Sequence, residues 1–184
     1  MTYGDWVHRS AERVAAERVA AVLAAAGARG RVRELPVAAR TAALAAEALG
    51  CPVGAIANSL VFAVRATSDA EPTPVLVLTS GAHQADLRRL ATLLDAVSVE
   101  LANPALVRTA TGYAVGGVPP IGHRTALPTL VDNALATYDE IWAAAGVPEA
   151  VFPTRYAELL AITGGTPADV AGQPAPGQTD QDRP

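Results

Sequence analysis

Ser59-Leu-Val-Phe-Ala-Val64 and Pro74-Val-Leu-Val-Leu-Thr79 are the two stretches that determine the fold class of this 184-residue chain. Both are apolar and rich in β-branched residues, and the turn-prone stretch 67–72 separates them. This pattern predicts two adjacent strands joined as a hairpin with a polar loop. Because the connection is too short for a parallel crossover, we expect a sheet that mixes antiparallel and parallel strands.

Helical and strand patterns alternate on both sides of this hairpin. The apolar spacing and the Gly and Pro stops predict helices at 5–26, 41–49, 84–94, 104–109 and 153–163. Shorter strands are predicted at 31–35, 96–100 and 127–131, with a further short element at 138–145. We therefore expect an α/β fold with a mixed β-sheet flanked by helices.

The length of the chain indicates a single domain. One core of this size buries enough surface for stability, so we expect residues 1–171 to form one domain, with the helix 5–26 packed on it. Residues 172–184 offer no side chains suited to a core, and a disordered tail is expected there.

The composition argues against several kinds of site. Cys51 is the only cysteine, so no thiolate cluster for zinc is available, and a packed thiol is favoured over a nucleophile. His8, His83 and His123 are too scattered in the sequence for a metal motif. Neither a Walker loop nor a G-x-G-x-x-G motif is present. We therefore expect no metal and no cofactor.

The sequence also indicates where the protein acts. Arg and Glu interrupt the Ala-rich segments every few residues, which argues against a membrane span. Residues 1–6 lack a basic leader followed by an apolar stretch, so no signal peptide is expected. We predict a cytoplasmic protein without membrane contact.

The charge is distributed unevenly along the chain. The formal net charge is −4, yet residues 1–40 hold seven Arg against four acidic residues, and the remainder holds seven Arg against fourteen. The basic N-terminal part is suited to contact with phosphates, although a solvated helix face followed by a basic loop is an equally good interpretation. Every basic residue is Arg, because the chain contains no Lys.

Gly116-Gly-Val-Pro-Pro-Ile-Gly-His123 is an unusually constrained stretch. Its first two glycines permit positive φ angles and close approach of another molecule to bare backbone. The two prolines fix φ and remove two N–H donors. Such a stiff loop presents its remaining N–H and C=O groups at set positions, where they can hold a carbonyl or a small polar ligand. The alternative is a tight turn between strands that only requires glycine.

This stretch resembles the G-x-x-x-P-x-G loop of the YbaK / prolyl-tRNA-synthetase-associated editing family. The segments 41–50, 56–62 and 75–81 resemble, in the same order, the helix before the first core strand of that family, the entry to that strand, and the next strand with its turn. The similarity runs from about residue 31 to residue 170. It implies that the mixed sheet is barrel-like.

The resemblance also implies a reaction and its partners. The expected activity is hydrolysis, in trans, of the ester that joins a wrong amino acid to the terminal ribose of a tRNA, with mischarged tRNA-Pro as a candidate. In this family the loop lines the pocket for the tRNA 3′ end, and a ribose hydroxyl of the substrate helps to activate water. An aminoacyl-tRNA synthetase is a further candidate partner. The alternative is a non-catalytic module of the same fold that binds a tRNA 3′ end, an aminoacyl derivative or a protein.

The resemblance suggests two groups of site residues. The catalytic candidates are Gly116, Gly117 and Asn58, and the substrate-binding candidates are Pro120, Gly122, His123, Ser80 and Phe62. Asn58 stands where many members carry a lysine, in a pattern similar to Lys-Thr-Leu-Val-Phe, and it offers hydrogen bonds without a cation. His123 and Arg124 are the candidates to replace that charge, unless both are solvated loop residues.

Two further polar residues leave alternatives open. Ser80 ends a predicted strand, so it either contacts the substrate or begins the turn before the next helix. Asp132 either faces the pocket or, as the favoured alternative, caps a short helix over residues 133–136.

Overall fold

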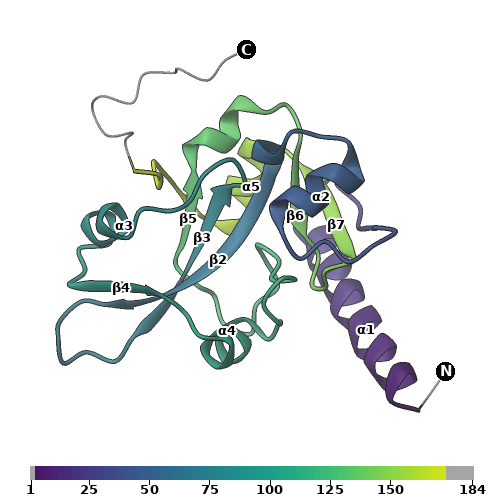
Figure 1. The fold of residues 1–184 in the computed structure, drawn as a ribbon, viewed down its shortest axis with the longest axis horizontal. Helices are drawn as coiled ribbons and strands as arrows, with labels where there is room; N and C mark the ends of the chain where they lie inside the picture. The colour runs from purple at the N-terminus through teal and green to yellow at the C-terminus, as the bar shows by residue number, and fades with distance from the viewer. Residues whose placement is uncertain (1–2, 173–184) are drawn as a thin grey trace.

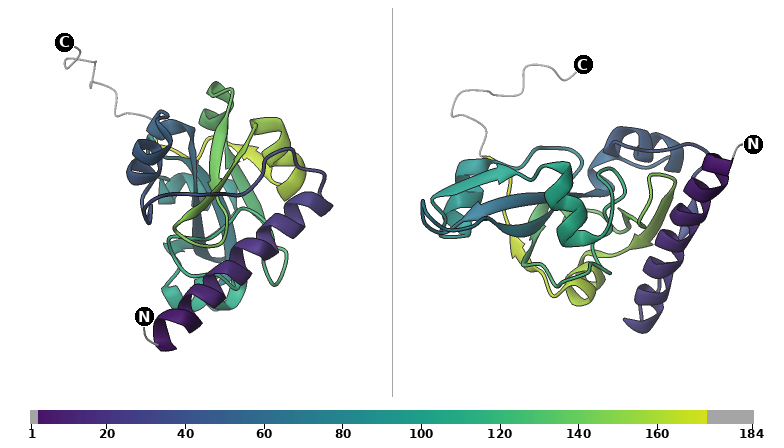
Figure 2. Two further views of the ribbon diagram at one scale, coloured as in Figure 1. Left: turned by 90° about the vertical axis from the view of Figure 1, so that its right-hand side faces the viewer. Right: turned by 90° about the horizontal axis from the view of Figure 1, so that it is seen from below.

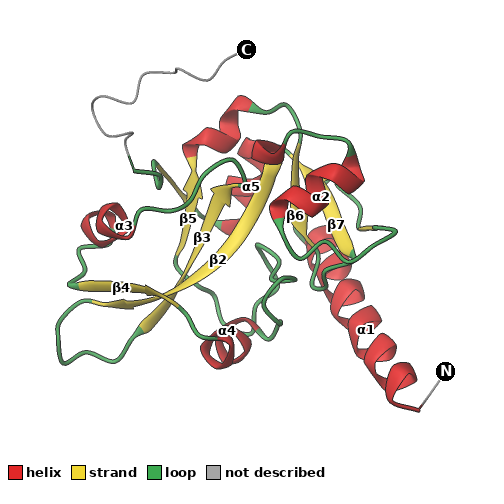
Figure 3. Cartoon of the chain, in the orientation of Figure 1, coloured by secondary structure: helices red, strands yellow, loops and turns green. Residues whose placement is uncertain are grey.

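The computed structural model describes residues 3–172, and the side chains from residue 12 onward. The predicted tail beyond Gly172 lies outside the described residues. Figure 1 shows helices arranged around one twisted sheet, and Figure 3 marks the same helices and strands by colour. No helix in the described range is both long enough and apolar enough to cross a membrane.

One mixed sheet organises the described chain. Its strands follow the order β1 (Arg33–Glu34), β7 (Ala150–Thr154), β6 (Ile141–Ala144), β2 (Ile56–Arg65), β3 (Thr73–Ser80), β5 (Thr129–Asp132) and β8 (Thr166–Ala168), and β4 (Ser98–Leu101) pairs with β2 off this path. The pairs β2–β6, β3–β5 and β5–β8 are parallel, and the other pairs are antiparallel. The expectation of a mixed sheet is confirmed.

The predicted hairpin is the centre of this sheet. β2 and β3 pair in antiparallel register from Ala57 opposite Ser80 to Val64 opposite Thr73. Leu76, Val77 and Leu78 of β3 are completely buried, because apolar clusters cover both faces of the strand. Burying each such side chain stabilises the fold by about 1.5–3 kcal/mol.

Five helices flank the sheet within the described residues. They are α1 (Tyr3–Ala25), α2 (Ala42–Leu49), α3 (Leu87–Leu93), α4 (Pro104–Thr111) and α5 (Tyr156–Thr163). All five correspond to predicted helices, with shifted boundaries. The start and the end of α2 are set by neighbouring residues in the sequence. The Thr41 hydroxyl accepts a hydrogen bond from the Leu44 N–H at the start, and Gly50 ends the helix at a φ of 66°.

The C-terminal part differs from the prediction. The helix expected from residue 153 begins only at Tyr156, because residues 150–154 form β7 and pair with β6. The element expected at 138–145 is β6 itself, and β8 was not predicted. Two 3-10 helices, η1 (Val53–Ala55) and η2 (Asn133–Thr137), complete the described elements.

Helix α1 lies at one end of the molecule, opposite α3, as Figure 2 shows. Its residues Val19 and Leu23 are almost fully buried and join the apolar cluster that contains Phe152 of β7. The helix therefore contributes directly to the core beside the sheet.

We expect Leu23→Ala to lower the free energy of unfolding by about 2–5 kcal/mol, because it leaves a cavity in this core. Val14→Ala is the matched control on the same helix, since Val14 is 60% exposed and its loss should change stability by less than about 0.5 kcal/mol. Urea unfolding followed by circular dichroism measures both. Equal effects of the two substitutions would contradict the packing of α1 on the domain.

Candidate active site

The strand pairing along one edge of β2 is interrupted at the middle of the strand. On that edge β2 pairs with β6 only at residues 56–57, and with β4 only at residues 62–65. The Ile56 carbonyl accepts from Gly81 on the β3 side, whereas the Val61 carbonyl accepts from Ala102 on the opposite side. Because alternate residues of a strand direct their backbone groups to opposite edges, the N–H and C=O of Ser59 point into the gap between β6 and β4.

A cavity of about 290 Å³ lies at this gap. Its walls are α2 with the residues before it, the middle of β2, the loop around Gly116, and the β6–β7 hairpin. The lining residues are Ala39, Arg40, Thr41, Ala42, Ala45, Ile56, Ala57, Asn58, Ser59, Leu60, Val115, Gly116, Val118, Trp142, Ala143, Ala144, Val147, Pro148, Ala150 and Val151. The volume is at the small end of the range for ligand pockets, about 300–1,000 Å³.

The two adjacent glycines of the loop have different structural tasks. Gly116 lines the cavity and has a φ of 89°, a conformation that other residues adopt only with strain. Gly117 packs against the β6–β7 hairpin so closely that an added Cβ would lie 2.7 Å from the Cα of Val147. The Gly117 N–H also donates to the Ala114 carbonyl at 3.2 Å, whereas the Gly116 N–H has no partner in the described structure.

The loop is braced from behind by Tyr113, which is 3% exposed. The hydroxyl of Tyr113 donates to the Gly122 carbonyl at 3.2 Å and accepts from Nε of Arg18 on α1 at 2.8 Å. The guanidinium of Arg18 also stacks 4.3 Å from the centre of the tyrosine ring. A chain of contacts therefore connects the N-terminal helix to the loop that lines the cavity.

His123 belongs to this brace rather than to the cavity wall. Its Nε2 lies 2.7 Å from the Pro119 carbonyl, which can only accept, so this nitrogen carries a proton. Burial lowers the pKa of His123 below its ordinary value, the Pro119 carbonyl partly opposes that effect, and the charge of Arg18 lowers the pKa further. At neutral pH the imidazole is therefore uncharged.

The structure brings some of the suggested residues together and separates others. Asn58 and Gly116 line the same cavity. The other loop residues that the resemblance suggested do not line this cavity; they are Gly117, Pro120, Gly122 and His123. Arg124 is also absent from the lining, and its side chain lies near Gly112 beside Arg18.

Phe62 and Ser80 lie in the interior, away from the cavity lining. Phe62 is 3% exposed and packs with the apolar cluster around Leu90 of α3. Ser80 is 1% exposed, and its hydroxyl donates to the Gly54 carbonyl at 2.8 Å. Of the two alternatives for Ser80, the geometry favours a structural role at the end of β3.

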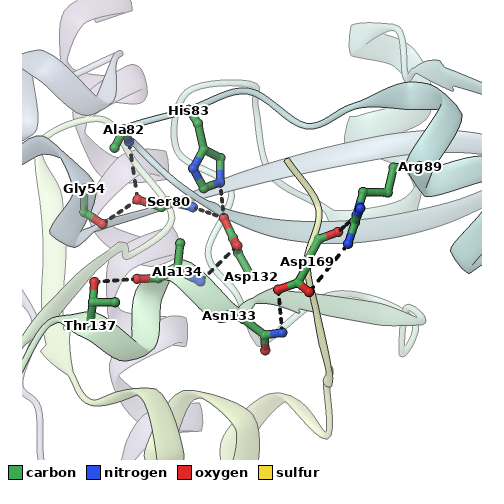
Figure 4. A network of polar contacts seen from close by, with 10 residues as sticks. All are labelled: Gly54, Ser80, Ala82, His83, Arg89, Asp132, Asn133, Ala134, Thr137 and Asp169. Carbon is green, nitrogen blue, oxygen red and sulfur yellow. Dashed lines mark hydrogen bonds and ion pairs between the residues drawn. The ribbon is translucent and has the colours of Figure 1, made fainter. Parts of the chain in front are cut away.

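Asp132 forms a separate polar network at the ends of β3 and β5, drawn in Figure 4. Its Oδ1 accepts from the Ala134 N–H at 3.1 Å, so the predicted cap of a short helix is confirmed. Its Oδ2 accepts from the Ser80 N–H at 2.9 Å and contacts Nε2 of His83. No sequence pattern predicted the His83–Asp132 pair, because 49 residues separate the two side chains along the chain.

Sequence reasoning also did not identify Ser59 and Arg40 as site residues. The Ser59 hydroxyl is buried and has no hydrogen-bond partner in the described structure, although the residue lines the cavity. Its position directly after Asn58 was the available signal. Arg40 lines the cavity from the residue before the N-cap of α2, a place that no motif indicated.

The chemistry available to the cavity follows from its lining. Arg40 is the only ionisable residue among the lining residues, so no side chain there can serve as a general base. The Cys51 thiol lies outside the lining, and its pKa is raised chiefly by burial. Within the described residues no group of three or more His, Cys, Asp or Glu side chains is placed to hold a metal ion. The polar groups of the lining residues are therefore neutral, apart from one guanidinium.

These features define a mixed α/β domain with a small ligand cavity beside a glycine- and proline-rich loop. Residues 37–162 match the model of the aminoacyl-tRNA editing domain, and the chain belongs to this family.

Three relatives illustrate the similarity. A crystal structure described as that of a candidate trans-editing enzyme for prolyl-tRNA synthetase is 41% identical, with a TM-score of 0.78, and the match covers 86% of this chain and 98% of that one. The crystal structure of hypothetical protein APE2540 is 27% identical, with a TM-score of 0.76 and coverage of 84% and 99%. A protein of Enterococcus faecalis described as a candidate Cys-tRNA(Pro)/Cys-tRNA(Cys) deacylase, EbsC, is 29% identical over 125 residues, which are 68% of this chain and 73% of that protein.

The His123 environment predicts a dependence of stability on pH. The folded state disfavours the imidazolium, so the unfolded chain binds this proton more readily. The stabilisation is therefore present above the ordinary pKa of about 6.5 and is lost as the pH falls below it. We expect the His123 signal in an NMR titration to have a midpoint below 6.5. We also expect His123→Gln to flatten the loss of unfolding free energy between about pH 7.5 and 5, and a midpoint above 6.5 would contradict the burial argument.

Proposed function

We propose that this protein is a trans-acting aminoacyl-tRNA deacylase that hydrolyses the ester between a wrong amino acid and the terminal ribose of a tRNA. The observation that carries this proposal is a set of four residues that line one cavity and have a polar group without a partner in the described structure: the Asn58 amide, the Ser59 hydroxyl, the Gly116 N–H and the Arg40 guanidinium. Asn58, Ser59 and Gly116 are buried or half-buried, where polar groups are normally paired within the protein, so their lack of partners indicates a ligand site. Arg40 is exposed and adds a charge to this group.

An ester suits this neutral cavity. An aminoacyl ester is already activated, so its hydrolysis needs a positioned water and stabilisation of the oxyanion more than a strong nucleophile. The water oxygen adds to the carbonyl carbon, and we assign the Gly116 N–H as the donor to the developing oxyanion. The bond to the ribose oxygen then breaks, and the proton from water passes to that oxygen. The products are a free amino acid and an intact tRNA end.

In this proposal the substrate itself supplies the base that the cavity lining lacks. The ribose carries a free hydroxyl next to the esterified one, and it is close enough to the ester to orient the attacking water. The Asn58 amide and the Ser59 hydroxyl can both donate and accept hydrogen bonds. Because neighbouring residues of a strand face opposite ways, we assign one of them to this hydroxyl and the other to the water. The absence of Asp, Glu and His from the lining agrees with such a division of work.

The names of the relatives support a substrate class. One is described as a candidate trans-editing enzyme for prolyl-tRNA synthetase and another as a candidate deacylase for Cys-tRNA(Pro) and Cys-tRNA(Cys). We therefore propose mischarged tRNA-Pro as the first substrate to assay, in the cytoplasm and in association with a synthetase that produces it. The small cavity favours a small amino acid.

A second function is favoured by the same lining. With Asn58 in the place of the lysine that many similar proteins carry, and with no side-chain base, the cavity also suits a module that binds a tRNA end without cleaving it. The two functions differ in one measurement. A binding module retains an amide-linked aminoacyl-adenosine tightly and leaves every ester in a panel of mischarged tRNAs intact.

Gly116→Val tests the catalytic loop. The new side chain enters the cavity wall and strains a residue with positive φ, which displaces the Gly116 N–H from its position. We therefore expect deacylation to fall by up to about 10²–10³-fold, the loss seen when an oxyanion donor no longer acts. Gly27→Val is the matched control, since Gly27 has a φ of 71° and open space around it, far along the chain from the cavity. Both variants should lose about 1–2 kcal/mol of stability.

Single-turnover hydrolysis of mischarged tRNA by the two glycine variants gives the readout. Loss of activity in both variants, or in neither, would remove the role assigned to Gly116. A lack of hydrolysis by the wild type across the full panel would remove the deacylase proposal.

Ser59→Ala separates function from stability in another way. The hydroxyl has no partner in the fold, so its removal should leave the free energy of unfolding unchanged or slightly higher, while hydrolysis slows by about tenfold or more. Thr79→Val is the control, because the Thr79 hydroxyl on β3 is also buried and unpaired but does not line the cavity. That variant should match the wild type in rate. An active Ser59→Ala variant would show that the hydroxyl does not face the substrate.

A further inference from the structure

We propose that Arg40 binds the phosphate group on the 5′ side of the terminal nucleoside of the tRNA, and so supplies the positive charge of this site from a different element than β2. This assignment rests on the proposed function, because it concerns the same cavity and the same substrate end.

Arg40 is positioned to reach a ligand from the rim of the cavity. It directly precedes Thr41, the N-cap of α2, and it lines the cavity together with the first turn of that helix. Its Cβ and Cγ lie 3.9 Å from the point where a Gly116 Cβ would stand. The aliphatic stem therefore lies beside the Gly116 loop, and the residue is exposed, so its guanidinium can reach a ligand at the mouth of the cavity.

The fold makes no use of this charge. Arg40 forms no ion pair and no hydrogen bond with any described residue. Other arginines are engaged, for example Arg18 with Tyr113, Arg65 with the Ala70 carbonyl and Arg89 with Asp169. No acidic residue lines the cavity to neutralise the guanidinium. An unpaired cation at the mouth of an otherwise neutral cavity is suited to an anion on the ligand.

The chemistry of the substrate leaves one choice for that anion. Esterification removes the negative charge of the amino acid carboxyl group, the α-amino group is neutral or positive, and the base and ribose are uncharged. The only anion near the scissile bond is therefore the phosphate of the terminal nucleotide. A guanidinium binds phosphate through two parallel N–H donors, which fixes orientation as well as affinity.

This arrangement also orients the substrate within the cavity. The guanidinium repels a protonated α-amino group, so we expect the α-amino group of the substrate to lie away from Arg40. The ester is then held between the phosphate end and the amino acid end, beside Ser59 and Gly116. Arg40 is thus a binding residue that sets the direction in which the tRNA end enters.

The test uses small analogues with an uncleavable amide in place of the ester. The probes are 3′-alanylamino- and 3′-cysteinylamino-3′-deoxyadenosine, each with and without a 5′-phosphate, and binding to the intact protein is measured by calorimetry. We expect the wild type to bind the phosphorylated form about 10–100-fold more tightly, which corresponds to hydrogen bonds with a charged group. Arg40→Ala should abolish this preference and leave the affinity for the unphosphorylated form unchanged.

Two further variants complete the design. Arg40→Lys should retain part of the preference, because it keeps the charge but loses the paired donors. Arg31→Ala is the control, since Arg31 is also exposed and unpaired but does not line the cavity. In hydrolysis of mischarged tRNA, Arg40→Ala should raise KM with little change in kcat, and reduce the slope of log(kcat/KM) against log salt concentration by about one.

The outcomes separate this inference from the proposed function. Equal loss of affinity for both forms of the analogue in Arg40→Ala, no loss for either, or no phosphate preference in the wild type would overturn the assignment, even if the protein hydrolyses esters. Conversely, a phosphate preference that depends on Arg40, found in a protein that leaves all esters intact, would support the assignment and remove the deacylase proposal.

Discussion

The interrupted pairing along one edge of β2 is the constraint on which the site depends. This strand has ten residues, but on that edge it meets two short partners that pair with its two ends. The backbone groups of Ser59 are thereby left without a neighbouring strand, although polar backbone groups inside a protein normally require partners. The fold places the Gly116 loop and α2 across this opening, so that the unpaired segment becomes the floor of a cavity instead of an exposed sheet edge.

The position of the Gly116 loop, and with it the shape of the cavity, depends on contacts with the β6–β7 hairpin and with the N-terminal helix α1. Gly117 allows the loop to contact the β6–β7 hairpin, and Tyr113 connects the loop to Arg18 of α1. Helix α1 precedes residues 37–162, the part that matches the editing-domain family. The geometry of the proposed site is therefore set in part by a helix that the family match does not include.

Local patterns predicted most of the fold, and tertiary contacts decided the rest. The β2–β3 hairpin and the five helices have apolar periods and caps that act within a few residues. The end of β7 was mistaken for the start of a helix, because Pro153 is a residue type that is also common at the first position of a helix. Asn58 and Phe62 lie on the same face of β2, so alternation alone places them together. Asn58 lies beside α2 and the cavity, whereas Phe62 packs in the cluster with α3. This difference follows only from the assembled structure. The same holds for Arg40, whose distance from Gly116 in sequence hides their contact.

The lining of the cavity has a consequence for how the reaction responds to its surroundings. Among the lining residues only Arg40 ionises, and a guanidinium keeps its proton throughout the physiological range. The charge of the side chains that line this site is therefore the same in mildly acidic and in mildly alkaline solution. If the cavity is the catalytic site, a titration in the rate near neutrality therefore belongs to the ammonium group of the bound amino acid, to water, or to His123 behind the loop, and not to a lining side chain.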